Sequence, residues 1–240
     1  MAISEPRLVL EKVDFHYTSR GTLLRRKRHH ALRNISFQVN AGETLGVIGG
    51  NGSGKSTLLK VIRGIYGHDS GRIERNYQKG ALLALGVGFD NELTGKQNIL
   101  LSGILSGARR KEVEAKKAEI IDFSELHDAI DKPLKTYSTG MRARLGFSIA
   151  VAMDSDLILI DEVLSVGDAG FRKKAMAAMK QRITANQAAI FVSHSLAQVK
   201  ELCDRVMWLD MGQIKLIDEA GVVIEAFVAA QTRAKIEPPA

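Results

Sequence analysis

Residues 44–57 read TLGVIGGNGSGKST and decide the fold of this 240-residue chain. The apolar run at 44–48 predicts a short buried strand, and a helix is expected from about Lys55 to Arg63. Between them, residues 49–56 fit the pattern G-x-x-x-x-G-K-[ST] in the strand–loop–helix context that this pattern requires. Glycines let backbone N–H groups turn inward around phosphate oxygens, and a helix N-terminus adds partial positive charge. We therefore predict a phosphate-binding loop in an α/β domain.

Three polar side chains at the end of this loop have predicted roles. Lys55 is expected to reach the β- and γ-phosphates of a nucleotide, Ser56 to ligate Mg²⁺, and Thr57 to bond phosphate oxygens. A glycine-rich turn without a ligand is the alternative, which the combination of pattern and context disfavours. The predicted nucleotide-binding residues of the loop are Gly49, Gly50, Asn51, Gly52, Ser53, Gly54, Lys55, Ser56 and Thr57.

A second stretch that carries chemistry lies at 157–162 and reads LILIDE. Four apolar residues predict a buried parallel strand, and two acids follow at its carboxyl end, where ligands bind in open α/β sheets. Asp161 is expected to hold Mg²⁺, directly or through water, and Glu162 to orient and polarise an attacking water. An Asp-Glu pair can also be an ordinary solvated turn, but the phosphate loop elsewhere in the chain favours the functional role.

The N-terminal third and the middle of the chain have different patterns. Apolar residues alternate at 8–15 and again at 32–39, which predicts two antiparallel strands joined by a loop. That loop holds the basic run RRKRHH at 25–30, which is either a solvated loop or a patch facing anionic lipid or a membrane-embedded partner. Residues from about 88 to 152 include a charged helical segment at 109–123 and indicate a helical insertion in the α/β body.

The C-terminal part continues the α/β pattern. An amphipathic helix at 171–183 lies between apolar strands at 157–160 and 189–193, and this order implies right-handed crossovers and a parallel sheet. A closing hairpin is expected at 206–217, and the tail after Glu225 is expected to fray.

The composition is that of a globular protein, with 45% hydrophobic and 25% charged residues and a formal net charge of +7. A basic balance favours acidic partners such as nucleotide, nucleic acid or anionic lipid headgroups. No run approaches the roughly 18–20 apolar residues of a membrane-spanning helix, and no signal-peptide core is visible, so a cytoplasmic location is expected. The single cysteine, Cys203, excludes an internal disulfide and is expected to be a buried structural thiol.

The stretch YSTGM at 137–141 indicates which family of phosphate-loop proteins the chain resembles. Alone, it predicts only the N-cap of a helix at 142–153. Placed between the phosphate loop and the acidic strand, it resembles the signature of ABC ATPases, in which Ser138 and Gly140 match the key positions. The residues that depart from the common form are Tyr137, Thr139 and Met141. The resemblance implies that this cap completes the ATP site of the opposite copy in an obligate homodimer.

Further segments follow in the order of that family. Residues 164–168 resemble the loop that couples the two sites across the dimer, with Asp168 at its acidic position. His194 follows a predicted strand and resembles the switch histidine that bonds the γ-phosphate and the attacking water. The catalytic residues implied by the resemblance are Glu162, His194 and Lys55.

The adenine contact is implied by the same resemblance. In the family, an aromatic residue ahead of the second strand stacks on the base, and Tyr17 is the best match. Two alternatives remain open: Tyr17 only packs at a strand end, or His29 or His30 supplies the ring instead.

A narrower likeness is to the ATP-binding subunits of O-antigen, capsule and teichoic-acid exporters. It is carried by residues 85–99, 137–147 and 161–173. One departure is that no glutamine stands just ahead of Glu92, in the loop entering the helical insertion, where most ABC ATPases have one, and Asp90 is the nearby polar candidate. The short chain resembles the members that lack an appended carbohydrate-binding domain.

The resemblance also implies the architecture and the partners. It implies a single ABC ATPase domain over 1–240: an α/β phosphate-loop NTPase (RecA-like) core with a mostly parallel sheet, an N-terminal antiparallel β subdomain, an inserted α-helical subdomain at about 88–152, and a tail at about 226–240. Mg²⁺ is the implied cofactor, and integral membrane permease subunits are the implied partners. The implied function is ATP-driven export of a lipid-linked polysaccharide from the cytoplasmic face of the inner membrane, without nucleic acid.

Three rival functions remain at this point. The chain could serve another ABC transporter class, such as an importer or a drug or lipid exporter. It could be a soluble ABC ATPase that acts on ribosomes or DNA, or a regulatory ATP-binding module without turnover.

Overall fold

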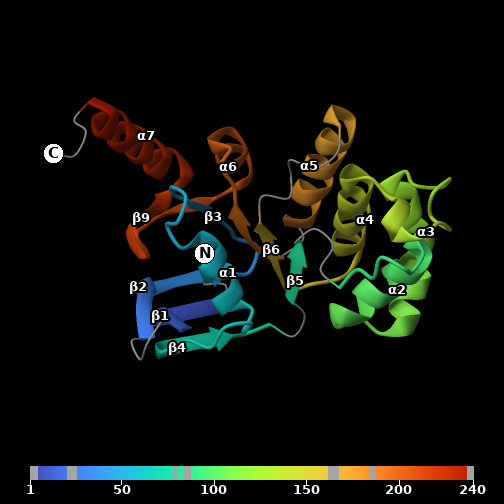
Figure 1. The fold of residues 1–240 in the computed structure, drawn as a ribbon. Coiled ribbons are helices and arrows are strands. Elements are labelled where there is room, and N and C mark those ends of the chain that lie inside the picture. The colour runs from blue at the N-terminus through green and yellow to red at the C-terminus, as the bar shows by residue number, and fades with distance from the viewer. Residues whose placement is uncertain are drawn as a thin grey trace. The chain divides into compact units, whose positions relative to one another are not determined.

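The computed structural model describes residues 5–20, 26–77, 80–83, 88–161, 168–183 and 187–236. The chain forms two compact units: unit 1 comprises Met1–Asn76 with Ile190–Ala240, and unit 2 comprises Tyr77–Ala189. Figure 1 shows the elements of both units. Unit 2 is wider than the predicted helical insertion, because it also holds strands and a helix of the α/β body.

Unit 1 contains an antiparallel sheet with the strand order β2-β1-β4. Its strands are β1 (Pro6–Arg20), β2 (Arg26–Asn40) and β4 (Ser70–Arg75). The two predicted N-terminal strands are therefore confirmed. The predicted loop over the basic run is wrong, because β2 already begins at Arg26 and pairs Arg28 with Thr18. Pairing with β1, which a local pattern does not reveal, extends the strand through these residues.

The second sheet of unit 1 positions the phosphate loop. Strand β3 (Thr44–Ile48) is fully buried and lies parallel to β8 (Arg205–Asp210), which pairs antiparallel with β9 (Gln213–Glu219). The predicted buried strand and the predicted hairpin are confirmed. Helix α1 (Lys55–Ile62) follows the loop, and α6 (Leu196–Leu202) follows β7 (Ala188–Val192).

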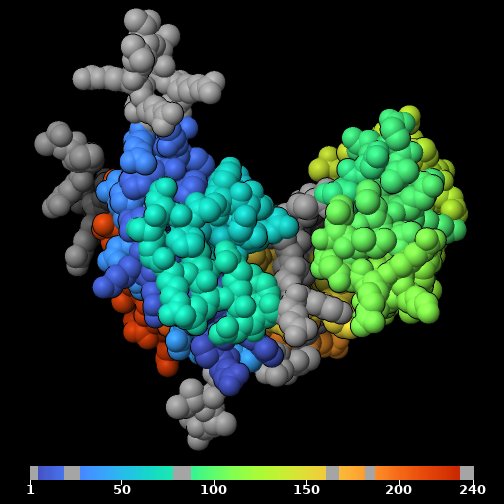
Figure 2. Space-filling model, turned by 90° about the horizontal axis from the view of Figure 1, so that it is seen from below, coloured from blue at the N-terminus to red at the C-terminus, as the bar shows by residue number. Residues whose placement is uncertain are grey.

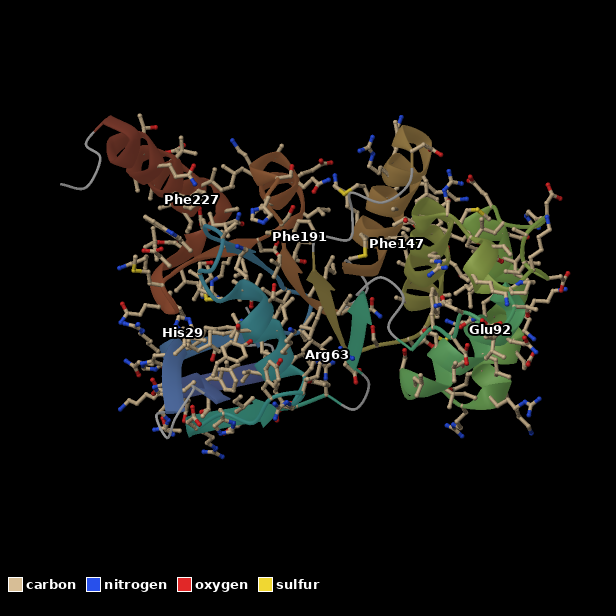
Figure 3. All side chains as sticks on the ribbon, in the orientation of Figure 1. His29, Arg63, Glu92, Phe147, Phe191 and Phe227 are labelled. Carbon is tan, nitrogen blue, oxygen red and sulfur yellow. The ribbon has the colours of Figure 1, made fainter. Side chains whose placement is uncertain are left out.

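The C-terminal segment is a helix, which corrects the expectation of a frayed tail from about residue 226. Helix α7 (Ala220–Ile236) packs on β8 and β9. Phe227 lies on the side of α7 that meets β8, where its ring is 5.5 Å from the ring of Trp208 at an angle of 79° (Figure 3). Val223, one turn earlier, is fully buried. Burial of these apolar side chains holds the segment in a helix beyond Glu225.

Unit 2 contains parallel strands and a group of helices. Strand β5 (Gly80–Leu83) pairs parallel with β6 (Leu157–Asp161). The helices are α2 (Gly95–Leu105), α3 (Arg110–Ser124), α4 (Thr139–Ala152) and α5 (Ala169–Ile183), with a 3₁₀ turn at Leu134–Thr136. In the space-filling view, α2 and α3 form one continuous green surface (Figure 2). The predicted helices and the α/β class are confirmed.

Helix α4 is tied to its neighbours by aromatic packing. The ring of Phe147 lies 6.0 Å from that of Phe123 at the end of α3 and 5.9 Å from that of Phe171 on α5 (Figure 3). Phe147 and Phe171 are almost completely buried. These contacts fix the orientation of α4 relative to α3 and α5, and Ser138 is the N-cap of α4. In the described part of the chain, no helix combines the length and the hydropathy that crossing a lipid bilayer requires.

Candidate functional site

The phosphate loop has the backbone that its glycines predict. Gly52 and Gly54 adopt φ values of 75° and 108°, which side-chain-bearing residues rarely adopt. Gly54 is the N-cap of α1, and glycine has no side chain with which to satisfy the first N–H groups of the helix. These N–H groups and the helix dipole make the start of α1 suitable for an anion.

Lys55 places its charge inside this loop. Its Nζ donates hydrogen bonds to the carbonyl oxygens of Gly49 at 2.8 Å and Gly50 at 2.9 Å, and the residue is only 7% exposed. A buried ammonium group is costly unless carbonyls or an anion surround it. Ser53 Oγ is also buried and has no hydrogen-bond partner within the described residues. The loop therefore holds a buried cation and an unsatisfied hydroxyl, both suited to phosphate oxygens.

Ser56 and Thr57 lie on the first turn of α1. Ser56 is exposed, next in sequence to Lys55, so its hydroxyl can reach a cation that enters with the phosphates. Mg²⁺ keeps several waters and is usually held by one or two protein oxygens together with substrate phosphates. Thr57 is buried, and its Oγ1 lies 3.0 Å from the hydroxyl of Tyr17. The residues on this turn fit a metal–nucleotide complex.

His194 lies on the same hollow as the loop. A hollow of about 270 Å³ in unit 1 is lined by residues that include Gly49, Gly50, Asn51, Ser193 and His194. Enclosed pockets for drug-sized ligands are roughly 300–1,000 Å³, so this hollow can take only part of a nucleotide. His194 lies two residues after the end of β7 and is exposed. Unit 1 thus brings the predicted switch histidine and the phosphate loop together.

Helix α7 contributes to this hollow, which sequence reasoning missed. Phe227 and Gln231, one helical turn apart, are among its lining residues. The available signal was the spacing of Val223 and Phe227, four residues apart on one helix face, the second of which lies in the segment that was expected to fray.

Tyr17 packs in an aromatic cluster beside α1. Its half-buried ring meets the ring of Phe15 edge-on at 4.9 Å and the ring of Tyr66 edge-on at 5.6 Å. Together with the hydroxyl contact to Thr57, this places Tyr17 next to the phosphate loop. This position is compatible with stacking of Tyr17 on an adenine and also with packing of Tyr17 at a strand end alone.

The ring of His30 is occupied by other contacts. It stacks on His16 with ring centroids 4.0 Å apart, and its Nε2 lies 2.8 Å from Asp14 Oδ1. The hydrogen bond from His16 to Asp69 holds the pKa of the Asp69 carboxyl below its usual value. His29 pairs with Tyr17 across the strands. The ring of His30 therefore contacts His16 and Asp14, and which of Tyr17, His29 and His30 stacks on adenine stays a prediction.

A second group of predicted site residues lies in unit 2 around Ser138. Ser138 is the N-cap of α4, where its Oγ accepts a hydrogen bond from the N–H of Met141 at 3.2 Å. The helix begins at Thr139, three residues earlier than predicted, because this cap lets it start there. A Cβ at Gly140 would meet only Ser138 Oγ, at 3.8 Å, so the cap is open to an approaching group. We call residues 138–140 the Ser138 cap.

Charged side chains surround the Ser138 cap. A hollow of about 540 Å³ is lined by residues that include Ser138, Gly140, Arg144, Asp168 and Glu125. The guanidinium of Arg144 forms ion pairs with Asp168 and, at 3.2 Å, with Glu125. Asp168 caps α5 by accepting the N–H of Phe171 at 2.9 Å, and this bond, with the nearby Arg144, lowers the pKa of its carboxyl. Asp168 and the cap therefore line one hollow.

Two departures from the common family pattern have local explanations. Tyr137 is buried and donates its hydroxyl to the carbonyl of Ala129 at 2.7 Å, and burial raises the pKa of that hydroxyl. It belongs to the core of the helices and not to the surface of the cap. Asp90 is exposed and accepts the N–H of Glu92 at 2.9 Å. Its carboxylate shapes the turn before α2.

The structure describes only part of the acidic segment at the end of β6. Asp161 ends β6, and the structure describes its backbone but not its side chain. Glu162 and residues 164–167 lie outside the described residues. Their predicted roles stay predictions.

Comparisons with known proteins agree with this geometry. A family model described as ABC transporter matches residues 32–165. The teichoic acids export ATP-binding protein TagH of Enterococcus faecalis is 45% identical over 199 residues, which are 83% of this chain and 44% of that protein. The O-antigen export system ATP-binding protein RfbB of Myxococcus xanthus is 44% identical over 88% of this chain and 49% of that protein. This chain thus spans less than half of either relative.

A shorter relative matches over most of its length, and solved structures share the fold. The O-antigen export system ATP-binding protein RfbB of Klebsiella pneumoniae is 39% identical over 216 residues, covering 90% of this chain and 88% of that protein. The dimeric ATP-binding cassette MJ0796 bound to ADP and Pi superposes with a TM-score of 0.76 at 20% identity, covering 89% of this chain and 98% of that one. An ATP-binding subunit of an ABC transporter gives 0.79 at 22% identity, over 92% of each chain.

Proposed function

Because the chain belongs to the ABC transporter family, we propose that it binds and hydrolyses ATP as the nucleotide-binding subunit of an exporter. One observation carries this proposal. The ammonium of Lys55 is held between the carbonyls of Gly49 and Gly50 at the start of α1, and these two glycines line one hollow with His194. A positive charge held by the loop, the N-terminus of a helix and a histidine beside the loop suit the terminal phosphates of a nucleotide.

The proposed chemistry divides among a few residues. Glu162 takes the proton of the attacking water, His194 donates a hydrogen bond to the γ-phosphate region, and Lys55 stabilises the charge that develops there. Mg²⁺, held by Ser56 and Asp161, would neutralise charge on the phosphates. Tyr17 would stack on the adenine. The contact of Tyr17 with Thr57, beside the loop, supports this assignment.

We further propose that two copies act together, head to tail. The Ser138 cap of one copy would close on the phosphates held by the loop of the other. The hydroxyl of Ser138, the absent side chain of Gly140 and the N-terminus of α4 are the features that suit a phosphate. Asp168, on the same hollow, would couple the two sites. A single copy then carries two half-sites.

The proposed cargo is a lipid-linked surface polysaccharide such as O-antigen, capsule or teichoic acid. The names of the relatives, which are teichoic-acid and O-antigen export proteins, and their identities of 39–45% to this chain support this cargo. The subunit would work at the cytoplasmic face of the inner membrane, bound to integral membrane permease subunits. Cells that carry the inactive Lys55→Ala chain should accumulate the lipid-linked polysaccharide on the cytoplasmic side. Normal surface display in those cells would contradict this cargo.

Lysine substitutions on α1 test the ATPase proposal directly. Lys55→Ala should lower ATP turnover by about 10²–10³-fold, because it removes a preorganised charge from the transition state. Lys60→Ala is the matched control, since Lys60 lies on the same helix but is exposed and faces the ring of Tyr66 at 5.6 Å. Its turnover should stay within about twofold of the wild type. Equal turnover in Lys55→Ala and Lys60→Ala would show that the phosphate loop takes no part in catalysis.

A further inference from the structure

The turn between β8 and β9 touches the phosphate loop through backbone atoms. This turn consists of Met211 and Gly212, with φ values of 45° and 76°, as in a type I′ hairpin. The N–H of Gly212 donates to the carbonyl of Ser53 at 2.9 Å, and its own carbonyl accepts the N–H of Arg33 at 2.7 Å. One residue therefore links the phosphate loop to β2.

Gly212 has a packing requirement beyond that of an ordinary hairpin turn. A Cβ at this position would lie 2.5 Å from the carbonyl oxygen of Ala31 on β2. The same oxygen would lie 2.9 Å from a Cβ at Gly54. The carbonyl of Ala31 thus occupies the space between two glycines, one in the loop and one in the turn. Any side chain at Gly212 would push the turn away from β2 and from Ser53.

The contact with Gly212 also sets the direction of one peptide group. In a planar trans peptide the C=O and the N–H point in opposite directions. The carbonyl of Ser53 points out of the loop toward Gly212, so the N–H of the following Gly54 points to the other side. N–H groups with this inward orientation form the anion-binding concavity of a phosphate loop.

We infer that Gly212 is a positioning residue for nucleotide binding, which holds the Ser53–Gly54 peptide so that the N–H of Gly54 donates to a phosphate oxygen. This inference rests on the proposed function. The end of β8 braces the loop at a second point, because a Cβ at Gly49 would lie 2.1 Å from the carbonyl oxygen of Leu209. The β8–β9 hairpin therefore contacts the loop at two points, at Gly49 and at Ser53.

The test compares Gly212→Ala with Gly64→Ala. The φ of Gly64 is 74°, almost that of Gly212, but a Cβ there meets nothing closer than 3.9 Å. Both variants therefore carry the same backbone strain, and only Gly212→Ala displaces the turn. Binding of Mg-ATP and of Mg-tripolyphosphate is measured by calorimetry, and folding is checked by circular dichroism.

We expect Gly212→Ala to raise the Kd for both ligands about tenfold or more, the loss of one hydrogen bond to a charged group. Gly64→Ala should stay within about twofold of the wild type. Equal affinity in the two variants overturns the inference while leaving the proposed function intact. A wild-type chain that binds no Mg-ATP refutes the proposed function itself.

A second measurement needs no substitution and tests the part of the inference in which the N–H of Gly54 donates to a phosphate oxygen. In the wild-type chain labelled with ¹⁵N-glycine, Mg-ATP should shift the amide resonance of Gly54 strongly downfield. The amide of Gly67, whose Cβ position has no neighbour within 4 Å, serves as the reference. A Gly54 amide that moves no more than that of Gly67 would contradict the inference.

Discussion

Backbone atoms brace the phosphate loop of unit 1, whereas side-chain charges surround the Ser138 cap of unit 2. The loop is held by Gly212, by the carbonyl of Leu209 and by the carbonyl of Ala31, each in close contact with a loop glycine or peptide. The hollow at the cap is lined by the ion pairs of Arg144 with Asp168 and Glu125. Two parts that are proposed to grip the same phosphates are thus stabilised in different ways.

This difference suits different tasks. Backbone contacts in a packed core vary little with salt or pH, so a loop built on them stays preformed for its ligand. Half-exposed ion pairs are weaker and are screened by salt, so a region built on them can rearrange at small cost. We therefore expect the loop to set the affinity for nucleotide and the cap to set whether a second copy can close on it.

The largest expected effect comes from separating the loop and the cap onto different chains. Lys55→Ala disables the loop, and Ser138→Arg blocks the cap, so each variant alone should lose about 10²–10³-fold in ATP turnover. In a mixed dimer, the intact loop of the Ser138→Arg chain meets the intact cap of the Lys55→Ala chain. A mixture of the two should regain turnover that neither has alone, measured by phosphate release.

The control for this mixture is a chain that carries both substitutions. Mixed with the Lys55→Ala chain, it supplies no intact loop and should give no recovery. If the first mixture also stays inactive, although both chains fold and form dimers, the loop and the cap do not act across two copies.

A smaller effect is expected from the charges around the cap. Arg144→Ala leaves Asp168 and Glu125 without their shared partner, and a small displacement of a catalytic group can lower kcat strongly. We expect kcat to fall roughly tenfold, while the Kd for ATP stays within about twofold, because the loop of the same chain is intact.

Arg144→Lys sharpens this prediction. It keeps the charge but loses the planar fork that contacts two carboxylates at once, so it should recover only part of kcat. The kcat of Arg144→Lys should also be more sensitive to salt than the kcat of the wild type, since a single exposed ion pair is screened more easily. A fall in ATP affinity equal to the fall in kcat would contradict the division of labour between loop and cap.

The same contrast explains which features the sequence could predict. The loop, β3 and α1 follow from a local run in which glycines supply the φ values and apolar residues the strand, and all three lie where the pattern predicts. Ser138 as an N-cap is equally local. Features of this kind depend on residues close in sequence.

The features that were missed depend on contacts between distant residues. Strand β2 extends through Arg28 because β1 pairs with it, and α7 persists because Phe227 meets Trp208. The contact of Gly212 with Ser53 joins residues far apart in sequence, so Gly212 looks like any glycine in a hairpin turn. Hydrophobic periodicity and turn chemistry cannot report such pairings.

The smallest expected effect concerns the acid stability of unit 2. The hydrogen bond from the N–H of Phe171, together with Arg144, lowers the pKa of Asp168. A group whose pKa is lower in the folded state stabilises the protein above its unfolded pKa, about 3.9 for Asp, and loses that contribution as pH falls through the folded pKa. Asp168→Asn keeps an N-cap acceptor but removes the charge. Its melting temperature should therefore lie slightly below that of the wild type at neutral pH, and the gap should close in acid below about pH 4. A gap that persists unchanged in acid would show that the carboxylate charge of Asp168 does not stabilise the region around the cap.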